Sequence, residues 1–373
     1  MRIGRMARVC GGSATILPLL MAQAEAQPIA EGFLVSDLSG VFYRGEEKSD
    51  CPEGRSLSLR ESYLQSRPPA DRERLLKPEN AAELDRGYKQ DYVFGKDGRD
   101  ICTDPELFDT PDHPLQKPFR GPIAPGMDLD GAAPGQTAAG TCAHDGFTSP
   151  SGESGVDNQM FRVTGCNTMW RGAGDSGKGE MAGPMDMGAN PVAIAVADVD
   201  DWRNDPHVEV LVGAVADRPV LDSKRTPMAG SSATLTADPR YRVTVAGRIK
   251  DGVLMTEAAN LIVPYSWVGA SGGELILRHM RLRLTRTQSG ELTGMIAGYR
   301  PIDNVIAMFR VGGPGTASTA GVDCASLRRS LRAMADGDLE PQTRQCSSVS
   351  SAMNMTARPA YIFDAGRLLN STR

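Results

Sequence analysis

Apolar and polar residues alternate along several segments in the second half of the chain. In two of these segments every second position carries an apolar side chain, at Val208, Val210, Val212, Tyr241, Val243 and Val245. Successive side chains of a β-strand point to opposite faces of a sheet, so a period of two predicts a strand with one buried and one solvent-exposed face. We therefore expect β-strands over much of residues 191–311.

Two short turn sequences divide these strands into pairs. Asp251-Gly252 and Ser289-Gly290 each follow one alternating segment and precede another. Such dipeptides favour tight hairpin turns, which join antiparallel strands. No helical pattern separates the strands, which disfavours a parallel sheet with crossover helices. We predict a mainly β fold with an antiparallel β-sandwich or jelly-roll-like core over residues 191–313.

The chain before this core has no comparable periodicity. Its short apolar runs are interrupted by proline, glycine and charged residues, and only residues 57–65 and 81–86 suggest brief helices. An irregular stretch of this length is unusual in a compact domain unless cross-links hold it. We predict that residues 27–190 form a loop-rich, disulfide-stapled region.

The chain after the core contains one amphipathic segment. Leu327, Leu331 and Met334 recur at helical spacing, with arginines on the opposite side. We predict one C-terminal helix, which packs with its tail on the core as residues 314–373.

The first 26 residues have the features of an export signal in the usual order. Three arginines lie among the first eight residues, an apolar stretch follows at residues 14–22, and Ala24-Glu25-Ala26 forms an A-x-A cleavage site. The apolar stretch is shorter than the ~20 residues that span a bilayer. We predict a signal peptide over residues 1–26, no membrane span, and a periplasmic or secreted location. A disordered cytoplasmic N-terminus is the alternative.

The charge of the chain limits its partners. The formal net charge is −5, and cleavage after residue 26 would make it −7 because three arginines and one glutamate leave. Nucleic-acid-binding domains are normally basic, so we expect no nucleic-acid partner. Residues 172–178 match glycine-rich phosphate-loop patterns but lack the flanking strand and helix that such loops need. We therefore expect no nucleotide either.

Six of the seven cysteines remain after the predicted cleavage, and an even number suits an oxidising compartment. Six cysteines allow 15 connectivities. Their spacing favours pairing between neighbours, namely Cys51 with Cys102, Cys142 with Cys166, and Cys324 with Cys346. Metal ligation is the alternative, but the C-x-x-C pairs typical of zinc sites are missing from the sequence.

Oxygen-donating side chains accumulate beside glycines between residues 127 and 159. Calcium binds six to eight oxygens from carboxylates, amides and backbone carbonyls, and loops can supply them. The spacing does not match an EF-hand loop, and turn or cap chemistry would also explain aspartates beside glycines. We predict a calcium site formed by Asp128, Asp130, Asp145, Asp157 and Asn158.

Two further features could carry catalysis. An acidic loop from Asp198 to His207 lies between two predicted strands and could supply a general acid and base. Ser271 lies in a G-x-S-x-G pattern, which in hydrolases exposes a nucleophile on a strand-turn-helix, but the helix is missing here. We expect a non-catalytic binding or structural module for an extracytoplasmic ligand. A secreted hydrolase or lyase acting on a polysaccharide or ester is the alternative.

Overall fold

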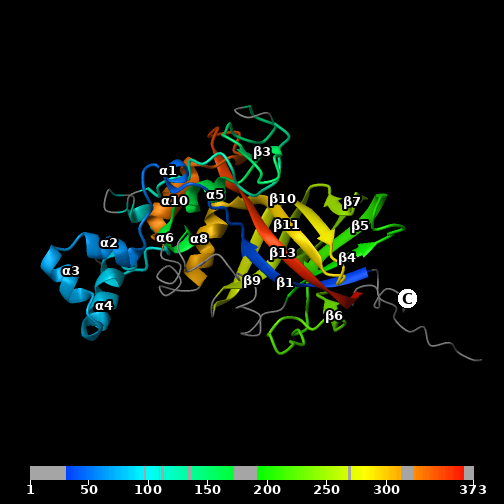
Figure 1. Cartoon of the computed structure of the whole chain (residues 1–373), viewed down its shortest axis with the longest axis horizontal. Helices are drawn as coiled ribbons and strands as arrows, with labels where there is room; N and C mark the ends of the chain where they lie inside the picture. The colour runs from blue at the N-terminus through cyan, green and yellow to red at the C-terminus, as the bar shows by residue number, and fades with distance from the viewer. Residues whose placement is uncertain are drawn as a thin grey trace, which may run out of the picture.

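The computed structural model describes residues 31–171, 191–311 and 322–364, except residues 96–97, 109, 111–112, 114, 133–135 and 268–269. The predicted signal peptide and the glycine-rich motif at residues 172–178 lie outside the described residues. Strand residues outnumber helical residues, which confirms the mainly β prediction. A large sheet occupies one end of the molecule, and the helices gather at the other end, with those of residues 59–92 farthest from the sheet (Figure 1).

The large sheet contains strands from both ends of the described chain. Its strands are β1 (Glu31–Gly40), β4 (Val192–Ala197), β5 (Asp205–Ala214), β6 (Ser232–Leu235), β7 (Arg242–Lys250), β8 (Val253–Thr256), β9 (Ala259–Trp267), β10 (Ala270–Arg286), β11 (Leu292–Pro301), β12 (Gly337–Leu339) and β13 (Cys346–Asp364). A separate small sheet pairs β2 (Phe147–Thr148) with β3 (Ser154–Val156).

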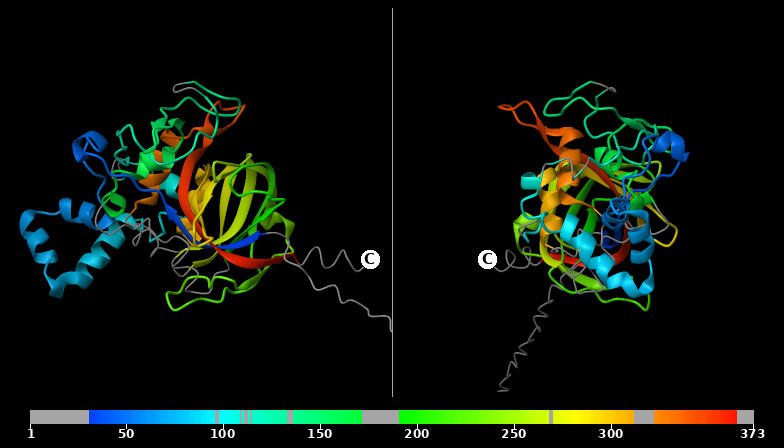
Figure 2. Two further views of the ribbon diagram at one scale, coloured as in Figure 1. Left: turned by 45° about the vertical axis from the view of Figure 1, so that its right-hand side comes forward. Right: turned by 90° about the vertical axis from the view of Figure 1, so that its left-hand side faces the viewer.

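The large sheet closes on itself. Its strands run in the order β1-β4-β5-β7-β8-β10-β11-β13, each antiparallel to the next, and β13 pairs again with β1. Strand β9 pairs with the first half of β10, whereas β8 pairs with the second half. Strand β6 adds to β13 in parallel, which makes the sheet mixed. Both views of Figure 2 show the curved strands enclosing a common interior.

The predicted sandwich or jelly roll is not confirmed, because the structure has one closed sheet where two packed sheets were expected. The difference arises from β1 and β13, which lie outside residues 191–313 and yet complete the ring between β4 and β11. Closure removes the unpaired strand edges that an open sheet would expose.

The interior of the closed sheet is packed with aliphatic and methionine side chains. All of the ring strands contribute alternate residues to one cluster, which includes Phe33, Ile194, Val196, Val208, Val210, Val212, Leu254, Leu277, Leu282, Leu284, Ile296, Met353 and Met355. This is the alternation that the sequence showed in β5, where Val208, Val210 and Val212 are buried while Glu209 is exposed.

Both predicted hairpins are confirmed. Asp251 and Gly252 join β7 to β8 with φ angles of 51° and 79°, and Lys250 pairs with Val253 across the turn. A primed two-residue turn requires positive φ at both positions, which an Asp-Gly pair tolerates. Ser289 and Gly290 lie in the turn between β10 and β11.

Helices form in more places than the sequence indicated, so a fold with one main C-terminal helix and only brief helices elsewhere is wrong. They are α1 (Glu47–Asp50), α2 (Leu59–Gln65), α3 (Pro69–Leu75), α4 (Ala81–Tyr92), α5 (Gln159–Thr164), α6 (Thr168–Arg171), α8 (Ile302–Val311) and α10 (Cys324–Ala333), with 3-10 turns η1 (Pro78–Asn80), η2 (Pro105–Phe108) and η3 (Pro239–Tyr241). Residues 57–65, 81–86 and 324–334 were expected to be helical and become α2, α4 and α10. The described helices include none long and apolar enough to cross a membrane.

A second apolar cluster joins helices α5, α8 and α10 to the end of the sheet. It includes Val163 of α5, Val305 and Phe309 of α8, Leu331 of α10 and Val349 of β13. Helix α8 begins directly after β11, so its apolar residues pack against the end of the sheet where β11 stops. We refer to these helices and the loops of residues 41–58 and 94–158 as the cap.

The predicted pairing of neighbouring cysteines is wrong. The structure joins Cys51 to Cys166, Cys102 to Cys324, and Cys142 to Cys346, across 115, 222 and 204 residues of sequence. The six cysteines in the described part of the chain are all paired, as expected from their even number.

Closeness in the sequence does not determine which cysteines pair in the folded chain. The entropic cost of closing a loop grows only with the logarithm of its length, so tertiary packing decides which thiols meet. Cys102 and Cys324 meet inside the cluster of α8 and α10, and Cys142 reaches the first residue of β13. Two of the three bridges therefore fasten the loop-rich half of the chain to its C-terminal elements.

We predict that the double substitution Cys102→Ala and Cys324→Ala lowers the free energy of unfolding by about 2–5 kcal/mol, because it removes a cross-link that closes a long loop. Urea unfolding of the variant and the wild type measures the loss. Mass spectrometry of a non-reduced digest should recover the peptides of Cys102 and Cys324 as one linked species. Recovery of Cys51 linked to Cys102 would contradict the observed connectivity.

Candidate metal site

An acidic cluster lies where two cap loops meet the outer face of the sheet. Met127 pairs with Asp157 in an isolated β-bridge, and Thr141 pairs in the same way with Gly337 at the start of β12. The side chains of Met127 and Leu129 pack against Tyr299 of β11. These contacts bring residues 128–130, residues 141–157 and the region before β12 to one place.

Three carboxylates converge in this cluster. One oxygen from each of Asp128, Asp130 and Asp157 lies within 4.8 Å of the others, in a group that could hold a metal ion. Each carboxylate is oriented by a backbone N–H: Gly131 donates to Asp128 at 2.6 Å, Ala132 to Asp130 at 2.7 Å, and Leu129 to Asp157 at 2.7 Å. Gly131 has a φ of 71°, which allows the turn that aims its N–H back at Asp128.

The surroundings of Asp128 raise the pKa of its carboxylate. Its partial burial raises its pKa, the bond from Gly131 opposes this, and the charges of Asp157 and Asp130 raise the pKa further. A raised pKa means that the ionised form is disfavoured where it stands. A cation placed among these oxygens would reverse that preference.

His144 supplies positive charge at the edge of the cluster. Its Nε2 lies 2.7 Å from Oδ1 of Asp157, and its Nδ1 lies 3.0 Å from the carbonyl oxygen of Cys142. Both partners are acceptors, so the ring is best satisfied as an imidazolium that donates from both nitrogens. Burial lowers the pKa of His144, but the bonds to Asp157 and Cys142 and the charge of Asp336 outweigh it and raise the pKa to about 9.

Two fully buried polar groups point to the same place. Asp336 is 0% exposed, and its Oδ2 has no hydrogen-bond partner among the described residues and lies 3.8 Å from Nε2 of His144. Burial raises the pKa of Asp336 to about 6, although the Ser350 N–H, 2.7 Å from its Oδ1, and the charge of His144 lower it. Buried oxygens without a hydrogen-bond partner are rare, and they often mark a ligand-binding or functional site.

The second buried group is the hydroxyl of Tyr299. The residue is 2% exposed, and within the described chain its hydroxyl also has no hydrogen-bond partner. Burial raises the pKa of Tyr299, and the charges of Asp336, Asp157, Asp130 and Asp128 raise it further. The phenol therefore stays protonated and can donate a hydrogen bond toward the acidic cluster.

Three of the five residues predicted to bind calcium come together here, and two do not. Asn158 is the N-cap of α5: its Oδ1 accepts from the Phe161 N–H and its Nδ2 donates to the Pro125 carbonyl. Asp145 is held through its backbone carbonyl, which accepts from Gln159 and Arg162. The carboxylate of Asp145 is not in the group within 4.8 Å, and both ends of the Asn158 amide are engaged by backbone groups.

Sequence reasoning missed His144, Tyr299 and Asp336 as members of the cluster. His144 is adjacent to the predicted ligand Asp145, so its position in the sequence indicated that it could belong to the cluster. Tyr299 and Asp336 lie more than 140 residues away from Asp157 in the chain, and no motif surrounds them. Only the folding of β11 and β12 against the cap places them beside the three aspartates.

In the acidic loop from Asp198 to His207, two aspartate side chains accept hydrogen bonds from the backbone of the loop itself. Asp205 is buried and accepts from the N–H of Asp200 at 2.7 Å and from the N–H of His207 at 3.0 Å. Asp201 accepts from the N–H of Arg203. These are the bonds of turn-closing aspartates, and they position no acid opposite a base.

Ser271 lies within β10, a strand, where the nucleophile elbow needs a strand-turn-helix. Its side chain is outside the description. His279, which the sequence offers as a base, belongs to the same strand eight residues later, about 25 Å along an extended chain.

Comparisons with protein-family models, with curated proteins and with solved structures found no match to this chain.

We predict that the folded protein loses stability as the pH rises from 7 to 10 in the presence of a chelator. The pKa of His144 is raised from 6.5 to about 9, so its contribution is complete below pH 6.5 and disappears as the pH rises through 9. The raised pKa of Asp336, from 3.8 to about 6, lowers stability between those two pH values, so its effect is already complete below pH 7 and leaves the slope from pH 7 to 10 to His144.

Urea unfolding at pH 7 and pH 10 tests this dependence. The His144→Asn variant should lose less stability over this interval than the wild type. The exposed His207 provides a matched control, since His207→Asn should follow the wild-type curve. Parallel curves for His144→Asn and the wild type would show that His144 is not held as an imidazolium.

Proposed function

We propose that the chain is an exported, non-catalytic binding or structural module whose cap is stabilised by a calcium ion at Asp128, Asp130 and Asp157. The observation that carries this proposal is the convergence of three carboxylates from two loops, beside the buried and unpartnered oxygens of Asp336 and Tyr299. The three disulfides support export, because such bonds persist in oxidising compartments.

The donor set favours calcium over other metals. The cluster offers carboxylate oxygens, without a cysteine, and the loops can add backbone carbonyls and waters, as calcium requires. Magnesium demands a tighter octahedral geometry and keeps its waters, so it should substitute poorly. Four aspartates face the imidazolium of His144 and the charge of Arg281, and a divalent cation would offset the remaining repulsion among the carboxylates.

The position of the cluster suggests a structural role for the ion. Asp128 and Asp130 lie in one cap loop, and Asp157 precedes α5 in another. The bridge of Cys142 to Cys346 fastens the second loop to β13. An ion that ties the two loops together would thus hold the cap against the closed sheet.

A non-catalytic role is favoured because the acidic loop from Asp198 to His207 bonds to its own backbone. For the alternative of a hydrolase or lyase, the described part of the chain supplies no specific supporting observation at that loop or at Ser271.

We predict that calcium raises the melting temperature of the chelator-treated protein. Binding confined to the folded state stabilises by about 2.7 kcal/mol when the free ion is at a hundredfold excess over its dissociation constant. Asp128→Asn should remove most of this shift, because it deletes the charge of one ligand and keeps its size. Scanning fluorimetry with chelator, millimolar calcium and millimolar magnesium measures the effect.

A matched control is Asp201→Asn, which changes an exposed aspartate in the other acidic loop and should leave the calcium shift intact. If the wild-type melting curve does not respond to calcium or chelator, the three aspartates form turns only and bind no calcium.

A further inference from the structure

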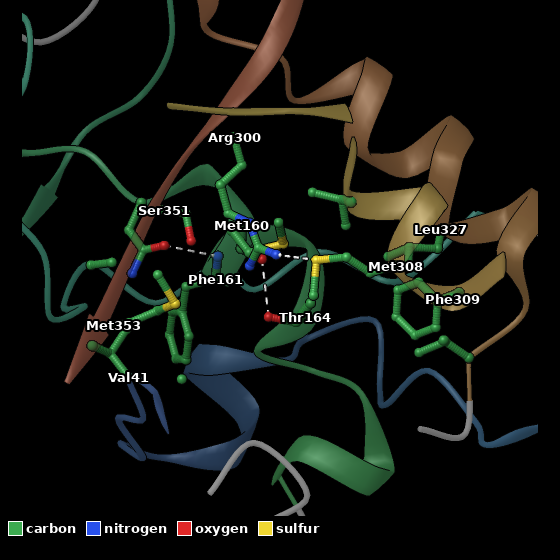
Figure 3. Close-up of a pocket in the computed structure, with 15 residues that line it drawn as sticks. Val41, Met160, Phe161, Thr164, Arg300, Met308, Phe309, Leu327, Ser351 and Met353 are labelled. Carbon is green, nitrogen blue, oxygen red and sulfur yellow. Dashed lines mark hydrogen bonds between the residues drawn. The ribbon is translucent and has the colours of Figure 1, made fainter. Parts of the chain in front are cut away.

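A small cavity lies between the end of the closed sheet and the helices of the cap. Its volume is about 40 Å³, and its walls are almost entirely apolar. They come from α5, α8, α10 and β13 and from the residues that follow β1, including Val41, Phe161, Met308, Phe309, Leu327 and Met353. Figure 3 shows these side chains around a common space, with Arg300 reaching into it from β11.

Arg300 is an unusual residue in the lining of an apolar cavity. The residue is 5% exposed, its Nε has no hydrogen-bond partner in the described part of the chain, and its Nη2 lies 2.9 Å from the sulfur of Met308. A thioether sulfur is a weak acceptor and carries no charge. No acidic side chain lines the cavity.

The other buried arginines of this protein are satisfied differently. Arg171 is 0% exposed and pairs with Asp50 and with Glu47, the latter at 3.0 Å. Arg162 donates to the carbonyls of Phe119 and Asp145 and stacks on an aromatic ring. The fold therefore supplies oxygen partners to its buried guanidinium groups, and Arg300 is the exception among the buried arginines described.

An unpaired buried cation is costly, and the cost is relieved when an anion binds to it. A carboxylate matches the flat guanidinium with two parallel hydrogen bonds. A phosphate dianion would bring a second charge and further acceptors that the apolar walls cannot satisfy. The lining thus selects a monoanion that carries apolar groups.

We propose that this cavity binds a short-chain aliphatic carboxylate, with its carboxylate on Arg300 and its hydrocarbon tail among Val305, Phe309 and Met353. A cavity of about 40 Å³ holds roughly three water-sized groups, which sets the tail at a few carbons. The methionines at positions 160, 308 and 353 can shift to fit it, because their side chains are flexible and polarizable. This assignment rests on the binding role proposed above and is independent of the calcium site.

Butyrate is the probe, and butyramide is its uncharged control of the same shape. Titration calorimetry at constant ionic strength should detect butyrate binding to the wild type and no butyramide binding. Arg300→Met should weaken butyrate binding about ten- to a hundredfold, since it removes charged hydrogen bonds. Arg310→Met, an exposed arginine at the end of α8, should bind butyrate as the wild type does.

The stability of Arg300→Met without ligand gives an independent readout. If Arg300 is unpaired in the empty protein, methionine should melt at the same temperature or higher, because it replaces a buried charge by an apolar side chain. A marked fall in melting temperature would show that Arg300 has a structural partner and would overturn the proposal. Equal binding of butyrate and butyramide, or no butyrate binding to the wild type, would also overturn it.

The titrations are run both with calcium and with chelator. A calcium-induced melting shift without butyrate binding would refute the ligand assignment and leave the calcium site standing. Butyrate binding without a calcium response would support the ligand assignment and refute the ion.

Discussion

The pairing of β1 with β13 is the constraint on which the rest of the structure depends. Eight residues of β1, from Gly32 to Gly40 with one irregularity, pair with β13, and three of them, from Gly32 to Leu34, also pair with β4 on the other edge. This pairing joins the first and the last described strands and turns an open sheet into a closed one. The valine and leucine side chains of β4, β5 and β10 are thereby enclosed in a single interior.

Closure also determines where the cap can lie. The apolar residues of α8 and α10 pack at the end of the sheet where β11 stops, and β13 contributes Val349 to the same cluster. Disulfides then connect Cys102 and Cys142 of the loop-rich half to α10 and β13. The third bridge, Cys51 to Cys166, lies in a buried cap cluster with Phe119, Phe147 and Phe161, so covalent links and aromatic packing together stabilise the loops of the cap.

Opposite faces of one strand carry the two candidate sites. Tyr299 of β11 faces outward into the acidic cluster, while the next residue, Arg300, lines the apolar cavity beneath α8. The outer site has an excess of buried and half-buried carboxylates, and the inner site has a guanidinium without a carboxylate. Each therefore has a charge that an oppositely charged ligand would balance, a cation outside and an anion inside.

The sequence by itself determined the features that depend on local spacing. The alternation of Val208, Val210 and Val212, the Asp251-Gly252 turn and the helical spacing after Cys324 each depend on residues that are close in the chain, so strands, hairpins and α10 were predicted correctly. The sequence also grouped Asp128, Asp130 and Asp157 in one candidate site, and the bridge between Met127 and Asp157 brings the three carboxylates together. Ring closure, disulfide connectivity and the membership of Tyr299 and Asp336 in the cluster were decided only by the tertiary structure. These features join residues between 115 and more than 300 positions apart, and the entropy of closing such loops hardly distinguishes one partner from another. The packing of the closed sheet against its cap makes that choice.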